Sequence, residues 1–154
     1  MSIKKIVIAQ YQQIVDRAGS SVEGFTMPKE GWMRTARKAL AMSGAQLGRR
    51  MGISRAQVSQ MERGEVSGGI TIKTMHKAAA ALGCRFVYAI VPEGSIEEVI
   101  ETRARQKATA IVEKTNEHMA LEAQTISDSK IKFEIDRLQQ EFLKDLPSSL
   151  WNDK

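Results

Sequence analysis

The sequence contains little of what several common classes of protein are built from. It has one cysteine, Cys84, among 154 residues, which excludes a disulfide within the chain and a zinc site made of several cysteines. Aromatic residues make up 5% of the chain, too few for the exposed rings on which RNA-recognition and single-strand modules stack bases. No apolar run is long enough to span a bilayer, and the first residues lack the continuous apolar core of a signal peptide. We therefore expect a cytoplasmic protein without membrane association.

A recognisable catalytic set is also missing. His76 and His118 do not have metal-ligand spacing to each other or to Cys84, and NEHMALE (116–122) lacks the second histidine of the zinc-protease motif. Cys84 lies in an apolar segment, which favours a small buried side chain over a nucleophile. Neither a P-loop nor a dinucleotide-binding fingerprint is present. We expect no enzyme activity, no bound metal and no cofactor.

Positive charge is what the sequence has in excess. It contains 23 Lys and Arg against 18 Asp and Glu, a formal net charge of +5. This balance favours a nucleic acid or an acidic protein as the partner. The length allows one compact domain, or a small domain with long helical extensions.

Both ends of the chain show helical spacing, so we predict a mainly all-α fold. In residues 1–27, a helix followed by a linker is expected, because apolar residues recur with the helical period at Ile3, Val7, Tyr11, Ile14 and Ala18. The β-branched run at 6–8 leaves a strand as the alternative. In residues 93–154, Ser95 opens a helix to about residue 124, TISDS (125–129) interrupts it, and a second helix follows. Leu150 and Trp151 near the end of the chain either fold back on its own core, which we favour, or dock on a partner.

In residues 28–83 the sequence contains start and stop signals that predict a group of short helices. A basic helix is expected over 29–42. Ser-x-x-Gln capping boxes begin at Ser43 and Ser54, and the second opens a helix that should stop at Gly64. A last helix runs from a Thr71 cap to Gly83.

The spacing within this group is typical of a DNA-binding helix-turn-helix. Gly48 lies where two helices must approach closely, and Gly52 opens the turn, where a positive φ is often needed. The apolar positions that hold the unit together are Leu47, Met51, Ile53, Val58 and Met61. A plain helical hairpin would satisfy these apolar positions, but it would require neither both glycines nor the basic flanks.

Residues 84–92 (CRFVYAIVP) predict the one β-strand of the chain, because they are β-branched and aromatic and end at Pro92. A lone strand leaves backbone groups unpaired, so it needs a partner. The partner is either the N-terminal segment or the same strand of a second copy. The second option gives a twofold homodimer with contacts through Phe86, Val87, Tyr88 and Ile90.

The segment RKALAMSGAQLGRRMGISRAQVSQMERGEVSGGITIKTMHKAAAALG resembles the Xre family, the Cro/C1-type repressors, over about Arg34 to Gly83. The resemblance implies a lambda-repressor-like helix-turn-helix domain, in which the helix opened by Ser54 enters the major groove. It places near base edges Arg55, Ala56, Ser59 and Gln60, and near the DNA backbone Arg63, Ser67, Gly68 and Gly69. It also implies a structural salt bridge between Glu62 and Arg37. The family's helix-opening Gln falls on Gly44, where a backbone N–H is left to bind phosphate.

The side chains on this helix suit base recognition. Arg55 can bond bidentately to guanine, Gln60 can bond to adenine, and Ala56 can meet a thymine methyl. The further candidates for backbone contacts, each equally open to being a solvated surface group, are Arg34, Lys38, Gln46, Arg49, Arg50 and Lys73.

A second resemblance extends beyond this domain, from about Gly31 to Gln124. GWMRTARKALAMSGAQLGRRMGIS, GGITIKTMHKAAAALGCRFVYAIVP and RQKATAIVEKTNEHMALEAQ are similar to the mobile mystery protein A family, whose members are encoded beside a Fic-domain protein. This implies a toxin–antitoxin pair in which the present chain is regulator and antitoxin. TAIVEK (109–114) departs at its last position from the Ser/Thr-x-x-x-Glu-Gly/Asn motif of many Fic inhibitors.

The expected function is a sequence-specific DNA-binding regulator, an autorepressor that binds a palindromic operator as a homodimer. The alternative is a protein-interaction module that neutralises a partner toxin and has little role in DNA binding.

Overall fold

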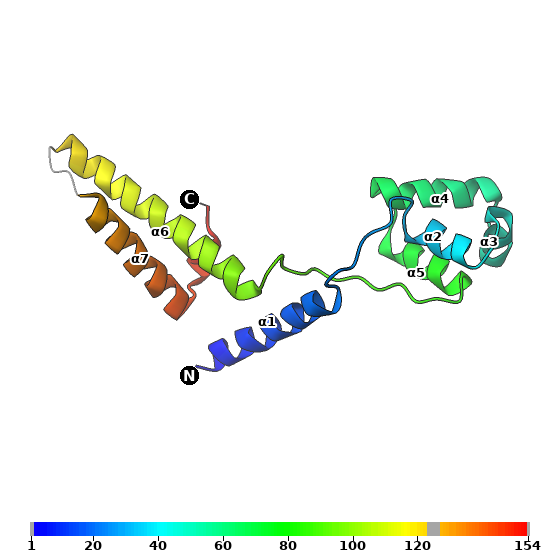
Figure 1. Ribbon diagram of the computed structural model, residues 1–154, viewed down its shortest axis with the longest axis horizontal. Coiled ribbons are helices and arrows are strands. Elements are labelled where there is room, and N and C mark those ends of the chain that lie inside the picture. Colours follow the sequence, from blue (N-terminus) through cyan, green and yellow to red (C-terminus); the bar gives the residue numbers. More distant parts are fainter. Residues whose placement is uncertain (1, 123–126, 154) are drawn as a thin grey trace. The chain divides into compact units, whose positions relative to one another are not determined.

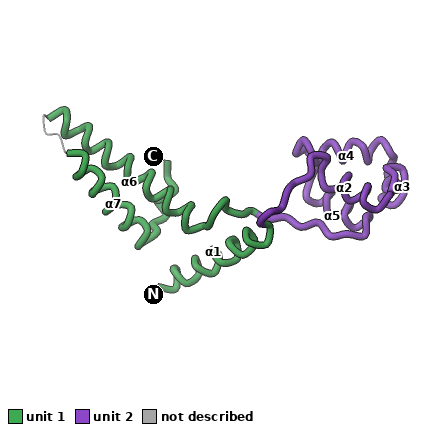
Figure 2. The backbone as a smooth tube through the Cα atoms, viewed as in Figure 1, with its two compact units in different colours: residues 1–22, 90–154 green, residues 23–89 purple. Residues whose placement is uncertain are grey.

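A computed structural model describes residues 2–122 and 127–153. Within these ranges the chain forms helices and no strand, which confirms the mainly helical class (Figure 1). The helices are α1 (Ile3–Ser21), α2 (Trp32–Ala39), α3 (Gly44–Met51), α4 (Arg55–Ser67), α5 (Ile72–Ala81), α6 (Ile96–Leu121), α7 (Asp128–Asp145) and the 3-10 helix η1 (Ser148–Trp151). They divide into two compact units, residues 23–89 and residues 1–22 with 90–154 (Figure 2).

The unit of residues 23–89 packs α2 to α5 around one small core. Each helix contributes buried apolar side chains, which are Met33, Leu47, Val58, Met75 and Ala78, with Leu82 just after α5. Met51, Ile53 and Met61 are partly buried against them. The inward positions expected from the spacing are therefore confirmed.

Three of the predicted helix starts in this unit are confirmed, at Ser43, Ser54 and Thr71, whereas α2 begins at Trp32 and not at the predicted residue 29. The hydroxyls of Ser43 and Ser54 each accept a hydrogen bond from the backbone N–H three residues later. In turn, the side-chain oxygen of the Gln at that position accepts a hydrogen bond from the backbone N–H of the serine. Thr71 caps α5 in the same way, with Thr74 N donating to its hydroxyl. These bonds satisfy N–H groups that a helix leaves unpaired at its start.

The predicted end of α4 at Gly64 is wrong. The helix continues to Ser67 and ends at Gly68, which has a φ of 84°. A glycine inside a helix costs about 1 kcal/mol relative to alanine. Packing of Gly64 against Ile70 and the contacts of Glu65 with α2 accompany this extension. Tertiary contacts therefore outweigh a local stop signal.

The turn after α2 holds a strained residue. Helix α2 ends at Ala39, earlier than the predicted residue 42, and Ala41 takes a φ of 55° in the left-handed region. Ala41 N donates to Lys38 O and Met42 N donates to Arg37 O, so the turn closes the C-terminus of α2.

Replacing Ala41 with glycine is expected to stabilise the protein by up to about 1 kcal/mol. Glycine adopts the left-handed conformation without steric cost, which outweighs its larger entropy in the unfolded chain. Denaturant unfolding of both proteins measures the difference. Ala39→Gly is the matched control, because it places glycine at the last helical residue of α2 and should destabilise by up to about 1 kcal/mol. Equal destabilisation by both substitutions would contradict the expectation.

The strand predicted at residues 84–92 is not found among the described residues. Residues 84–91 follow α5 as irregular chain, and Cys84 is exposed rather than buried, because the turn at Gly83 brings it to the surface. The alternative that residues 6–8 form a strand is wrong, since they lie inside α1. The N-terminal segment therefore offers no edge for strand pairing. Pairing between two copies stays a prediction.

The other unit is built on a helical hairpin in which α6 and α7 lie side by side (Figure 1). Its core contains Ala108, Val112 and Ile135. Ser95 caps α6, as predicted, and the predicted continuation of this helix through residues 123 and 124 lies outside the described residues. Asp16 of α1 accepts a hydrogen bond of 2.9 Å from the N–H of Ile96.

The end of the chain folds back on α6. Leu150 is 1% exposed, so the favoured alternative is confirmed for this residue. Arg103 Nε donates to Leu150 O at 2.7 Å, and its guanidinium lies 5.9 Å from the ring centre of Trp151. Trp151 itself stays half-exposed.

Candidate nucleic-acid interface

The turn between α3 and α4 is fixed by two glycines. A Cβ on Gly48 would lie 2.7 Å from the carbonyl oxygen of Ile53, closer than atoms approach without a shift of the backbone. The same two residues share a hydrogen bond of 2.8 Å, from Ile53 N to Gly48 O. Gly52 has a φ of 71°. Both glycines are therefore required by this geometry, as predicted.

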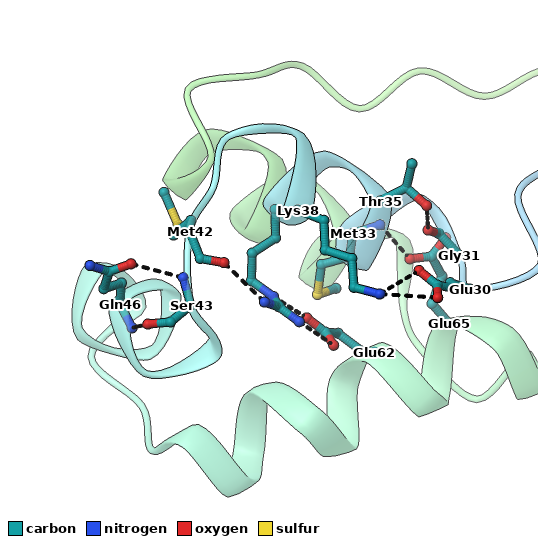
Figure 3. Close-up of polar contacts among 11 residues, drawn as sticks. Glu30, Gly31, Met33, Thr35, Lys38, Met42, Ser43, Gln46, Glu62 and Glu65 are labelled. Atoms are coloured by element: carbon teal, nitrogen blue, oxygen red, sulfur yellow. Dashed lines mark hydrogen bonds and ion pairs between the residues drawn. The ribbon is translucent and has the colours of Figure 1, made fainter.

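A largely buried ion pair joins α4 to α2. Arg37 Nε donates to Glu62 Oε1 at 2.6 Å, and Nη2 donates to Oε2 at 3.2 Å. Arg37 Nη1 also donates to Met42 O at 3.0 Å. Figure 3 labels the two residues, Glu62 and Met42, that accept these bonds. The side chains of Arg37 and Glu62 are only 13% and 9% exposed, and the hydrogen bond with Glu62 raises the pKa of Arg37. The structural salt bridge expected from the family resemblance is thus present.

A second carboxylate of α4 caps α2, and the sequence analysis missed it. Glu65 accepts hydrogen bonds from Trp32 N at 2.6 Å and Met33 N at 2.8 Å. Gly31, the residue before α2, makes no side-chain cap, and a Cβ there would lie 2.9 Å from Glu65 Cδ. The one sign of this cap in the sequence is that the residue before α2 is Gly31 and not Ser, Thr, Asp or Asn, so the cap has to come from elsewhere in the chain. Because a carboxylate also favours a helix N-terminus electrostatically, Glu62 and Glu65 hold both ends of α2 (Figure 3).

The residues predicted to face bases lie on the exposed side of α4 and at its N-terminal end. Arg55, Ala56 and Gln60 are exposed and Ser59 is half-buried, whereas Val58 and Glu62 face the interior. A Cβ on Gly44 would lie 3.7 Å from Arg55 Cγ, so the stem of Arg55 rests at the start of α3. The structure therefore brings Gly44 and Arg55 together at neighbouring helix starts.

Several of the side chains predicted to contact the DNA backbone form hydrogen bonds within their own unit. Arg50 Nε donates to Ala81 O at 2.6 Å, Lys38 Nζ donates to both carboxylate oxygens of Glu30 at 3.1 Å, and Gln46 Oε1 accepts from Ser43 N at 2.8 Å. Contact with phosphate would compete with these bonds. The other predicted contacts are exposed as well: Arg34, Arg49, Arg63, Lys73, Ser67, Gly68 and Gly69. Of these, Arg63 Nη1 donates to Ser59 Oγ at 3.0 Å and Ser67 Oγ donates to Gly64 O at 3.3 Å. Gln46, Arg49 and Arg50 also line a shallow hollow of about 550 Å³.

Charge is unevenly divided between the two units. Residues 23–89 contain 11 Lys and Arg, four Glu and no Asp, a net charge of +7. The remaining residues contain 12 Lys and Arg against 14 Asp and Glu, a net charge of −2. The excess positive charge of the chain therefore belongs to the unit that contains α3 and α4, as expected for a surface that meets phosphates.

Residues 33–88 match the Helix-turn-helix family model. These residues form an Xre-type helix-turn-helix domain. No curated protein and no solved structure matches the chain. The Xre-type domain supports a DNA-binding regulator, as expected.

The predicted dimer residues lie at and beyond the end of the Xre-type domain. Val87 and Tyr88 are each 65% exposed and Ile90 is 92% exposed. Phe86 instead packs against the core, and its ring lies 5.5 Å from that of His76 and 5.7 Å from that of Tyr88. Three of the four side chains are thus available to a partner.

Residues 2–122 and 127–153 contain no group of three or more His, Cys, Asp or Glu placed to hold a metal ion. None of the helices in the same ranges is both long and apolar enough to cross a bilayer.

Proposed function

We propose that this protein is a sequence-specific transcriptional regulator that places α4 in the major groove of double-stranded DNA. The observation that carries this proposal is that one side of α4 is fixed to α2, by Glu62 and Glu65, while the side turned away from α2 presents Ala56 and Gln60 to solvent. Arg55, the first residue of the helix, is exposed at its N-terminal end. A reading helix needs this combination, because base discrimination requires side chains held on a rigid support.

We further propose that it acts as a homodimer on a palindromic operator. Exposed Val87, Tyr88 and Ile90 on a segment without a strand partner suit pairing with the same segment of a second copy. Two Xre-type domains related by a twofold axis would then contact half-sites about 34 Å apart. Binding at its own promoter would repress transcription by excluding polymerase.

A second role, in antitoxin function, is favoured by the apolar surface of α1. Ile3, Tyr11 and Ile14 are 81%, 67% and 65% exposed, and α1 contains no buried residue. Exposed apolar side chains on one helix favour a protein partner. Together with the likeness to mobile mystery protein A, this supports neutralisation of a neighbouring Fic-domain toxin. Co-expression and co-purification of the two proteins test this role. If no complex forms, the antitoxin role fails and the DNA-binding proposal is unaffected.

The proposal places the protein in the cytoplasm and assigns it no enzyme activity. Its partners are DNA, a second copy of the chain and a Fic-type toxin. If instead the protein binds the toxin but shows no salt-sensitive binding to DNA, the alternative of a pure protein-interaction module is favoured.

Substitution of the reading residues tests the proposed function. Arg55→Ala and Gln60→Ala should each lose about 5- to 150-fold in discrimination at one base pair of the half-site, because each removes a bidentate base contact of roughly 1–3 kcal/mol. Fluorescence anisotropy with the upstream region of the gene, with single-base variants of it and with a shuffled sequence measures this.

Lys132→Ala is the matched control for these substitutions, because it removes an exposed positive charge from α7 in the other unit. It should leave base discrimination unchanged. If Arg55→Ala and Gln60→Ala bind as selectively as the unmodified protein, α4 is not the reading helix.

A further inference from the structure

Arg63 and Ser59 lie one turn apart on the exposed side of α4 and are joined by a hydrogen bond. Arg63 Nη1 donates to Ser59 Oγ at 3.0 Å. Helical side chains tilt toward the N-terminus, and four residues span about 6 Å along the axis. The guanidinium of Arg63 is therefore held back toward the part of α4 that carries Ala56 and Gln60, away from the C-terminal end of the helix at Ser67.

This bond orients Arg63 without neutralising it. Arg37 is paired with a carboxylate, whereas the partner of Arg63 is a neutral hydroxyl. Across residues 2–122 and 127–153, no carboxylate lies within ion-pair distance of Arg63. A guanidinium has five N–H donors. With Nη1 directed to Ser59, the edge formed by Nε and Nη2 remains for a second, bidentate acceptor.

Ala56 keeps the space in front of this guanidinium open. It lies seven residues before Arg63, so the two residues share one side of the helix. A methyl group there does not reach the region over which Arg63 folds. Ala56 is exposed, so nothing else in its own unit covers this position. The exposed side of α4 thus offers one oriented cation above a short side chain.

We propose that Arg63 is a specificity-determining residue that reads a guanine, and that Ser59 is its positioning residue. Guanine O6 and N7 form a pair of acceptors that fits the free edge of the guanidinium. This assignment exchanges the roles expected from the family resemblance, which placed Ser59 at a base and Arg63 at the backbone. It rests on the proposed function, because it requires α4 to lie in the major groove.

The test uses the full-length protein, the operator and a set of operators with each base pair substituted in turn. Arg63→Ala should lose discrimination by about 5- to 150-fold at one G·C pair of the half-site. Arg63→Lys should lose it as well, because an ammonium keeps the charge but not the bidentate edge. Ser59→Ala should lose part of the discrimination at the same base pair, and the double variant should be no worse than Arg63→Ala.

Other outcomes overturn the assignment. A uniform loss over all operators, with a salt slope smaller by about one and rescue by lysine, would make Arg63 a phosphate contact. A change at a different base pair in Ser59→Ala would make Ser59 a reader itself. Gln60→Ala is the control variant, and it should act at another base pair. If the unmodified protein selects no operator, the proposed function fails first, which separates that result from failure of the Arg63 assignment.

Discussion

Replacing Glu62 with alanine is expected to lower the free energy of unfolding of residues 23–89 by about 3 kcal/mol or more. The substitution leaves the buried guanidinium of Arg37 with one protein acceptor, Met42 O, and an uncompensated buried charge is costly. Denaturant unfolding followed by the fluorescence of Trp32 measures this. A Trp151→Phe background leaves Trp32 as the only tryptophan.

Two further variants separate the cost of the unpaired charge from the attraction within the pair. Glu30→Ala removes the exposed partner of Lys38 in the same unit and should change stability little. The double variant Arg37→Met with Glu62→Leu should recover much of the loss, because apolar residues of similar volume often replace a buried pair without cost. A small effect of Glu62→Ala alone would show that water reaches Arg37 and that the pair does not hold α2.

The effect of Glu62→Ala should not depend on pH near neutrality. The pKa of Arg37 is raised, so its stabilising contribution is fully present below the unfolded pKa and is lost only as pH rises through the folded one, far into the alkaline range. The control substitution Glu30→Ala should instead show its pH dependence in the acidic range. Lys38 lowers the pKa of Glu30, so the contribution of that exposed pair is present above the unfolded pKa and is lost as pH falls through the folded one.

Features that depend on a few neighbouring residues could be predicted from the sequence. The capping boxes at Ser43 and Ser54 involve residues three apart, and the requirement for Gly48 and Gly52 follows from one tight turn. In such cases the local pattern specifies both the start of the helix and the residues that secure it.

Features that depend on distant residues could not be predicted in this way. Glu65 caps a helix 33 residues earlier in the chain, and no local motif records this partner. Helix α4 passes through Gly64, with Glu65 bound to the start of α2 and Gly64 itself close to Ile70, so a residue that often ends helices does not end this one. Residues 84–91 have the composition of a strand, but a strand also needs the edge of another strand to pair with, and the segment's own sequence does not show whether one is present. The bond between Ser59 and Arg63 could not be predicted from the sequence either, because charge alone does not show where a guanidinium is directed.

Replacing Gly48 with alanine is expected to have the largest effect on DNA binding of any single methyl addition in α3 or α4. The new Cβ would meet a backbone carbonyl at 2.7 Å and the backbone carbon of Ser54 at 3.3 Å, and neither can move without shifting the turn. We expect a loss of stability of about 1–3 kcal/mol. We also expect a loss of operator affinity larger than the unfolded fraction explains, because Ser54 begins the reading helix and α4 would be displaced relative to α3.

Gly64→Ala on α4 is the matched comparison, and it should act in the opposite direction. A Cβ there would lie 3.8 Å from Ile70 Cβ, an ordinary contact, so the gain in helix propensity of about 0.5–1 kcal/mol is not offset by a clash. Unfolding curves and operator titrations of both variants give the comparison. If Gly48→Ala folds and binds as the unmodified protein does, the close approach of α3 to the turn does not fix the reading helix. If Gly64→Ala is destabilised as strongly as Gly48→Ala, the cost reflects alanine in these helices in general and not the carbonyl of Ile53.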